Sequence, residues 1–187
     1  MNLRALLAAD WARLQRLSGS PQEARPWSSF VSPRFAPVWV LRVAQALHAS
    51  GWQRAAKVFS LLNVLLFGLE VPTSLQIGPG LVITHPYGTV LGAARIGANA
   101  TLYQQVTLGA GEADFGFDPA KRPVVEDNVT ITAGAKVLGP VTLGEGCTVG
   151  ANAVVLCNVP PGHLAVGVPA RLLDRSASIH ASITSGD

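Results

Sequence analysis

The sequence predicts a helical segment over residues 1–69, followed by a parallel β-helix with three-sided coils over residues 70–173. Two observations support this: apolar residues recur at helical spacing before Glu70, and an aliphatic residue recurs at about every sixth position after it. A period of six fits neither a helix nor a simple amphipathic strand. It fits a short strand and a turn, repeated and stacked in coils.

The composition agrees with extensive burial. Of the 187 residues, 49% are hydrophobic and 13% are charged. This excludes a disordered chain and indicates burial in a core or between subunits. Residues 1–69 carry eight Lys or Arg and two Asp or Glu, whereas residues 70–187 carry six and nine. The basic segment therefore suits an anionic surface or an acidic face of another subunit.

The chain shows no sign of export or of a metal site. Cys147 and Cys157 lack a metal-like spacing to histidines, so we expect no metal and a reducing compartment. Asp10 and Arg13 interrupt the apolar stretch that a secretory signal would need. The apolar run 58–69 is shorter than the roughly 20 residues of a membrane span. We expect a cytoplasmic protein without a nucleic-acid partner; peripheral contact with the inner membrane face through residues 1–69 is an alternative.

Three helices are expected before the β-helix. The second runs from about Pro37 to Gly51, and the third from about Gln53 to Phe67, with Gly68 as its C-terminal cap. A Pro/Ser-rich connector separates the first helix from the second. The first helix ends near residue 18, and its apolar face comprises Leu3, Leu6, Leu7, Trp11 and Leu14.

The six-residue period assigns one inward side chain to each strand. One extra residue interrupts the period before Val90, and a loop at residues 110–123 interrupts it before Val125. Small or branched residues tend to follow four positions on, where a narrow prism leaves little room. The inward positions are Val71, Ile77, Ile83, Val90, Ile96, Leu102, Leu108, Val125, Ile131, Val137, Leu143, Val149 and Val155, and the small ones are Ala100, Val106, Ala135, Val141, Cys147 and Ala153.

The segments "VTLGAG", "ITAGAKVLGPVTLGEGCTVGANAVVL" and "VPPGHLAVGVPARLL" resemble those of hexapeptide-repeat acyltransferases, chiefly the serine acetyltransferase type. The resemblance covers residues 70–173 and leaves residues 174–187 as a polar tail. It implies a left-handed β-helix, a hand that generic connection rules would not predict. It also implies acyl transfer from acetyl-CoA, without a metal.

In this family a histidine in an "HxxG" segment is the general base, and His85 of "THPYG" stands at that position. A neutral imidazole can take the proton of an alcohol as the thioester is attacked, which contributes about 10²–10⁴-fold in rate. Glu70, fifteen residues upstream, matches the aspartate that orients this histidine. Because that separation is close to one coil, we expect Glu70 to stack beside His85; the alternative is a solvated carboxylate.

The positions that bind the acceptor in serine enzymes are changed. Arg122 replaces the histidine of an "RHP" segment, after Lys121, and Thr84 replaces an aspartate. We therefore expect Thr84, Lys121 and Arg122 to contact the hydroxyl-bearing acceptor, a small molecule or a sugar, as in related O-acetyltransferases of polysaccharide biosynthesis. L-Serine, in cysteine synthesis, is the alternative. Arg122 suits a carboxylate or a phosphate, unless it pairs with Glu126 or Asp127.

The resemblance also implies where acetyl-CoA binds. The matching positions are Gly109, Ala133 and Ala151 at coil corners, with Arg171 and Arg175 near the CoA phosphates. Active sites would lie between the subunits of a homotrimer, two of which can pair. Because the chain ends in "ITSGD" rather than isoleucine, we expect no complex with cysteine synthase. A non-catalytic β-helix scaffold or binding subunit is the alternative from another functional class.

Overall fold

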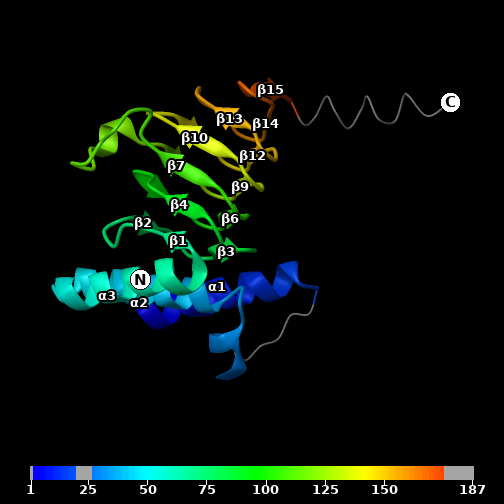
Figure 1. The fold of residues 1–187 in the computed structure, drawn as a ribbon. Coiled ribbons are helices and arrows are strands. Elements are labelled where there is room, and N and C mark those ends of the chain that lie inside the picture. Colours follow the sequence, from blue (N-terminus) through cyan, green and yellow to red (C-terminus); the bar gives the residue numbers. More distant parts are fainter. Residues whose placement is uncertain (1, 20–26, 175–187) are drawn as a thin grey trace.

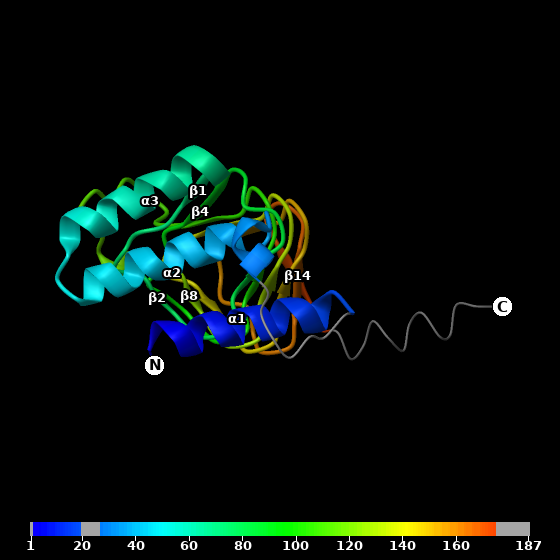
Figure 2. The same ribbon diagram turned by 90° about the horizontal axis from the view of Figure 1, so that it is seen from below.

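The computed structural model describes residues 2–19 and 27–174. Its helical segment contains α1 (Leu3–Leu17), a short 3-10 helix η1 (Trp27–Val31), α2 (Ala36–Ala49) and α3 (Gln53–Phe67). These bounds confirm the three expected helices, and Gly68 caps α3 in the left-handed conformation, with φ of 62°. The helices lie across one end of the β-helix (Figures 1 and 2). None of those in the described ranges is long and apolar enough to cross a bilayer.

The rest of the described chain consists of short strands and one further 3-10 helix, η2 (Pro119–Lys121). The strands are β1 (Leu69–Glu70), β2 (Gln76–Ile77), β3 (Val82–Ile83), β4 (Thr89–Leu91), β5 (Arg95–Ile96), β6 (Thr101–Leu102), β7 (Thr107–Gly109), β8 (Val124–Val125), β9 (Thr130–Ile131), β10 (Lys136–Leu138), β11 (Thr142–Leu143), β12 (Thr148–Val149), β13 (Val154–Val155), β14 (Leu164–Val166) and β15 (Arg171–Leu173).

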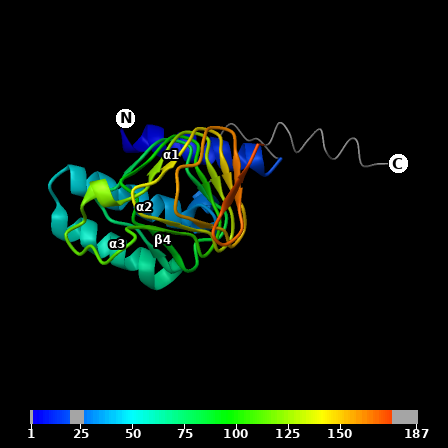
Figure 3. The same ribbon diagram turned by 90° about the horizontal axis from the view of Figure 1, so that it is seen from above.

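The strands form three sheets, one for each side of the coil. Sheet A is β1-β4-β7-β10-β13, sheet B is β2-β5-β8-β11, and sheet C is β3-β6-β9-β12-β14-β15. Neighbours within a sheet pair in parallel, and β15 alone returns antiparallel to β14. Seen along the axis, the coils superpose around a shared core (Figure 3). This is the expected left-handed parallel β-helix.

The interior of the prism follows the six-residue period, with one shift. Every predicted inward residue is buried except Val90, whose place Leu91 takes in register with Leu108. The shift arises at the corner of residues 84–88, which folds over the end of α3. There the backbone N–H groups of Gly88 and Thr89 donate to the carbonyl of Gly68. This corner thus takes up one residue more than the sequence predicted.

The small positions are also buried as predicted. Ala100, Val106, Ala135, Val141, Cys147 and Ala153 all belong to the core. Burial, with a contribution from the charge of Glu126, raises the pKa of the Cys147 thiol to about 11. Cys147 is therefore a packing residue rather than a nucleophile at neutral pH.

A buried ion pair docks α1 against α2 and the first coil. Arg42 donates to both carboxylate oxygens of Asp10, at 2.8 and 3.1 Å, and the two side chains are 1% and 0% exposed. Arg42 also donates to the carbonyls of Ile77 and Gly78. Asp10 accepts the backbone N–H of Leu81 at 2.8 Å. Because both charges are hydrogen-bonded on all sides, the pair fixes the position of α1 on the β-helix.

Candidate functional site

His85 lies at the corner between β3 and β4, and its side chain is exposed. The turn that carries it contains Pro86 and Gly88, whose φ of 71° favours glycine. The imidazole lines a cleft of about 470 Å³ rather than the aliphatic core. Its position is therefore accessible to an acceptor from solvent.

The cleft lies between the β-helix and the helical segment. One wall consists of side chains of the β-helix: Val82, Thr84, His85, Thr101, Tyr103 and Thr130. The other consists of Arg13, Leu14, Leu17, Ser18 and Arg34. Threonine, serine and tyrosine hydroxyls thus share the cleft with one imidazole and two guanidinium groups. Within the described ranges, no carboxylate lines it.

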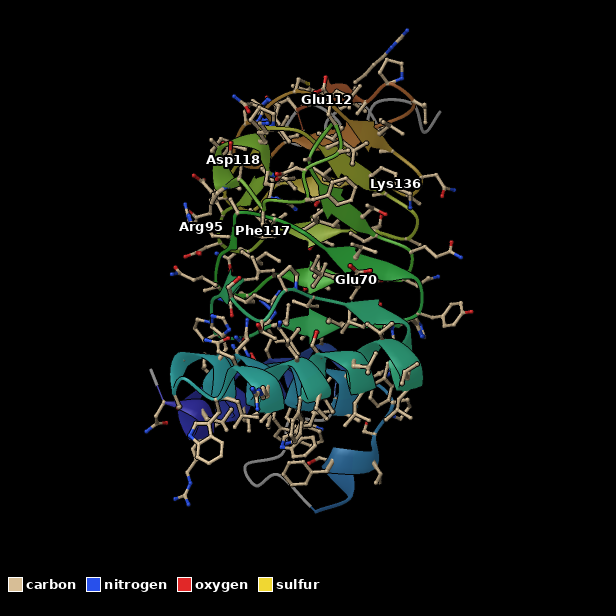
Figure 4. The ribbon with its side chains drawn as sticks, turned by 60° about the vertical axis from the view of Figure 1, so that its left-hand side comes forward. Glu70, Arg95, Glu112, Phe117, Asp118 and Lys136 are labelled. Atoms are coloured by element: carbon tan, nitrogen blue, oxygen red, sulfur yellow. The ribbon has the colours of Figure 1, made fainter. Side chains whose placement is uncertain are left out.

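Glu70 does not stack on His85. Parallel pairing of β1 with β4 sets Glu70 opposite Val90, so one coil here takes twenty residues rather than fifteen. The Glu70 side chain is exposed on sheet A (Figure 4). Within the described parts of the chain, no hydrogen bond or ion pair joins it to His85. The expected stacking is wrong because a regular coil already takes eighteen residues, as from Lys136 to Val154, and the wide 84–88 corner lengthens this one further. A role for Glu70 in orienting the imidazole stays a prediction.

Arg122 is held within its own loop. Its Nε donates to Oδ2 of Asp114 at 3.0 Å, and its Nη1 and Nη2 donate to the carbonyls of Gly92 and Asp114. The guanidinium also lies 3.9 Å from the ring centroid of Phe117. Its carboxylate partner is therefore Asp114, and not Glu126 or Asp127, which the sequence had offered as the alternative to acceptor contact. These contacts fix the conformation of the 110–123 loop.

The pKa of Asp114 reflects this arrangement. Burial of the carboxyl raises its pKa, but the hydrogen bonds from Arg122 and from the backbone N–H of Asp118 outweigh that effect, together with the charges of Arg122 and Lys121. The net result is a pKa below the ordinary value. The carboxylate is thus ionised at neutral pH and keeps its bond to Arg122.

One chain does not bring the three predicted acceptor residues together. Thr84 stands beside His85 at the corner between sheets C and A, whereas the loop with Lys121 and Arg122 connects sheet A to sheet B. The two groups therefore lie at different corners of the prism. Thr84 is at the corner where the strands of sheet A begin, and the loop is at the corner where they end. Figure 4 shows the loop residues Phe117 and Asp118 farther from the helices than Glu70. A single site that contains all three residues needs a second chain.

The predicted acetyl-CoA positions are also divided between two corners of the prism. Ala133 and Ala151 lie on turns at the corner that carries His85, in adjacent coils, where the carbonyl of Ala133 accepts the N–H of Asn152 at 2.9 Å. Gly109 lies at the corner between sheets A and B, at the end of β7, and an added Cβ there would meet nothing within 4 Å. Arg171 is exposed on β15. Arg175 lies outside the described residues. These donor contacts stay predictions.

Sequence interpretation missed Arg13 and Arg34. Arg13 follows Asp10 by three positions and precedes Leu14 by one, so it borders the buried face of α1. A charged residue on an otherwise apolar helix face was the available signal. Nothing in the sequence marked Arg34, because it reaches the cleft only through the tertiary position of the turn between η1 and α2.

The comparisons with known proteins agree with this fold. The model of the family described as bacterial transferase hexapeptide (six repeats) matches residues 122–157. Two curated proteins, each called serine acetyltransferase, cover more of the chain. The one from Mycobacterium tuberculosis is 39% identical over 149 residues, 79% of this chain and 63% of that protein. The one from Helicobacter pylori (strain J99) is 38% identical over 135 residues, 72% of this chain and 77% of that protein.

The chain belongs to the serine acetyltransferase family. The matched region spans less than two thirds of the Mycobacterium tuberculosis member, at 63% of its length. The crystal structure of a Neisseria gonorrhoeae serine acetyltransferase superposes with a TM-score of 0.81 at 26% identity, covering 99% of this chain and 70% of that one. The structure of a serine acetyltransferase in complex with CoA superposes with a TM-score of 0.78 at 27% identity, covering 91% of this chain and 69% of that one. Family membership confirms the resemblance drawn from the hexapeptide segments.

Proposed function

We propose that this protein is an acetyl-CoA-dependent O-acetyltransferase with His85 as general base. The observation that carries the proposal is an exposed imidazole that lines a cleft of about 470 Å³, at the position of the family's base. The neutral imidazole takes the proton of the acceptor's hydroxyl group while the hydroxyl oxygen attacks the thioester carbonyl. Collapse of the tetrahedral intermediate breaks the C–S bond, and the imidazolium returns its proton to the departing thiolate. A backbone N–H at the glycine-containing corner would stabilise the oxyanion.

L-Serine is the acceptor that the comparisons favour. The curated relatives at 38–39% identity carry the name serine acetyltransferase, which supports the alternative rather than the sugar or general acceptor that the altered residues suggested. A sugar hydroxyl remains the second candidate. It is favoured by Thr84, which replaces an aspartate, and by Arg122, whose guanidinium is engaged in its loop.

We also propose that acetyl-CoA lies along the edge of Ala133 and Ala151, between two subunits of a homotrimer. The CoA complex of a similar serine acetyltransferase supports the cosubstrate. The separation of Thr84 from Arg122 across sheet A supports a shared site, since the loop of one subunit can complete the cleft of the next. Exposed Leu61, Leu65 and Leu66 of α3 support peripheral membrane contact as an alternative use of the helical segment in a cytoplasmic protein.

A substrate screen tests the proposal. Purified protein should release free thiol from acetyl-CoA in the presence of L-serine, and more slowly with homoserine or neutral sugars. Calorimetry should detect CoA binding to the wild type and to His85→Ala alike. The matched control is His163→Asn, because His163 does not line the cleft and its loss should leave turnover unchanged. Absence of both CoA binding and thiol release would favour a non-catalytic scaffold.

A further inference from the structure

The wall of the cleft opposite His85 is cationic. We propose that Arg13 and Arg34 form an anion-binding subsite that holds a carboxylate or phosphate group of the acceptor while its hydroxyl faces His85. The inference rests on the proposed acetyl transfer and adds a specificity rule to it: the acceptor is an anionic alcohol. Both arginines come from the helical segment of the same chain.

Arg13 has unused hydrogen-bonding capacity at this wall. Its Nη2 donates to Oγ1 of Thr101 on sheet C at 2.9 Å, and the Arg13 side chain lines the cleft. Its Nε is buried and has no partner among the described residues. Burial and the charge of Arg16 lower the pKa of Arg13, yet a guanidinium stays protonated at neutral pH. An anion in the cleft would supply the missing counter-charge.

Arg34 approaches from a different segment. It follows η1, its side chain is exposed, and it shares the cleft with Arg13. No hydrogen bond or ion pair of Arg34 occurs within residues 2–19 and 27–174. Among the described residues, the other partly or fully buried arginines have a carboxylate partner: Arg42 has Asp10, and Arg122 has Asp114. Two guanidinium groups that line one cleft, with no carboxylate among its described lining residues, suit a carboxylate or phosphate ligand.

The rest of the cleft suits a compact polar molecule. Its volume of about 470 Å³ lies toward the lower end of the range typical of small-molecule sites. Thr84, Tyr103 and Thr130 bring hydroxyl groups to the same wall of the cleft as His85. An acceptor anchored by its anion would therefore present its hydroxyl to His85 without needing Arg122.

Matched acceptors test this rule. L-Serine and L-serinamide differ in a carboxylate, and sn-glycerol 3-phosphate and glycerol differ in a phosphate, so the two pairs separate the two anion sources. In one of the two pairs, we expect the wild-type kcat/KM for the anionic compound to be at least ten times that for its neutral counterpart. Arg34→Gln, at an exposed position, should raise KM for that anionic acceptor at least tenfold and should leave KM for the neutral acceptor unchanged. Arg13→Lys should retain more affinity than Arg13→Gln.

The control is Arg16→Gln, one turn further along α1. Arg16 is exposed, donates to the carbonyl of Ala12 and does not line the cleft, so its loss should leave KM unchanged. An Arg34→Gln enzyme that matches this control with both anionic acceptors would overturn the subsite. So would an effect confined to KM for acetyl-CoA that disappears with the phosphate-free donor S-acetyl-N-acetylcysteamine, because the arginines would then hold the donor phosphates.

Direct binding separates this proposal from the catalytic one. Inorganic phosphate or L-serine is titrated into the protein by calorimetry without acetyl-CoA, using wild type, Arg34→Gln and Arg16→Gln. Binding that weakens at least tenfold only in Arg34→Gln supports the subsite even if no acceptor is acetylated, and in that case only the proposed enzymatic function fails. Equal affinities in all three proteins would refute the subsite while leaving acetyl transfer to be judged by thiol release.

Discussion

Replacing Asp10 by alanine tests whether the buried ion pair holds the helical segment on the β-helix. The substitution removes two hydrogen bonds from Arg42 and the acceptor of the Leu81 N–H. Arg42 keeps its bonds to two backbone carbonyls, but its charge is left without a counter-ion at a site that is 1% exposed. Removing one partner of a buried pair costs about 3–5 kcal/mol. We expect a loss of that size in the free energy of unfolding.

Urea denaturation followed by far-UV circular dichroism measures this loss, at one fixed protein concentration because oligomers gain stability by mass action. Thermal unfolding should shift down by roughly 6–20 °C, since about 2–4 °C corresponds to each kcal/mol in a chain of this size. The exposed Arg16→Ala serves as control and should change stability by less than about 0.5 kcal/mol. The double variant Asp10→Leu/Arg42→Met should recover most of the loss. A loss below about 1 kcal/mol for Asp10→Ala would refute the reasoning.

Three further substitutions test the loop, the core and the corner. Because the pKa of Asp114 is low, its bond to Arg122 stabilises the loop fully above the ordinary carboxyl pKa, about 4, and this stabilisation is lost as the pH falls through the lowered pKa. Limited proteolysis of residues 110–123 should accelerate over that pH range, whereas the Asp114→Asn variant should be cleaved readily at every pH. Ile131→Ala, at a fully buried inward position, should cost about 2–5 kcal/mol in urea unfolding, and a cost near zero would contradict the packing assignment. Gly68→Val places a Cβ at φ of 62° within 3.0 Å of the Tyr87 ring, so it should displace the His85 corner and lower kcat more than CoA affinity; unchanged kcat would contradict that link.

The stacked coils could be predicted from the sequence because the prism imposes a size rule at repeated positions, whereas their left hand followed from the family resemblance. Residues such as Ile131 and Ala135 alternate large and small at fixed spacing, since a three-sided coil has one apolar interior that every strand faces. The helix ends were predictable for a local reason: Gly68 adopts a positive φ that other residues avoid. His85 was identified through its motif, and its exposure agrees with that assignment.

The remaining parts depend on tertiary geometry that no local pattern encodes. Val90 and Leu91 are both aliphatic, so only the width of the preceding corner decides which one turns inward. The partner of Arg122 depends on how its loop folds back on itself, and Asp114 was not distinguishable from other nearby carboxylates. The contribution of Arg13 depends on where α1 crosses sheet C. That crossing is fixed by the pair of Asp10 and Arg42, two residues that are far apart in sequence.

The most direct measurement is acceptor-dependent thiol release from acetyl-CoA by wild type and His85→Ala, with CoA affinity measured in parallel by calorimetry. If the exposed imidazole is the general base, kcat falls by about 10²–10⁴-fold while CoA binds both proteins equally. Wild-type turnover in His85→Ala would show that another group takes the proton and would remove the basis of the assigned site.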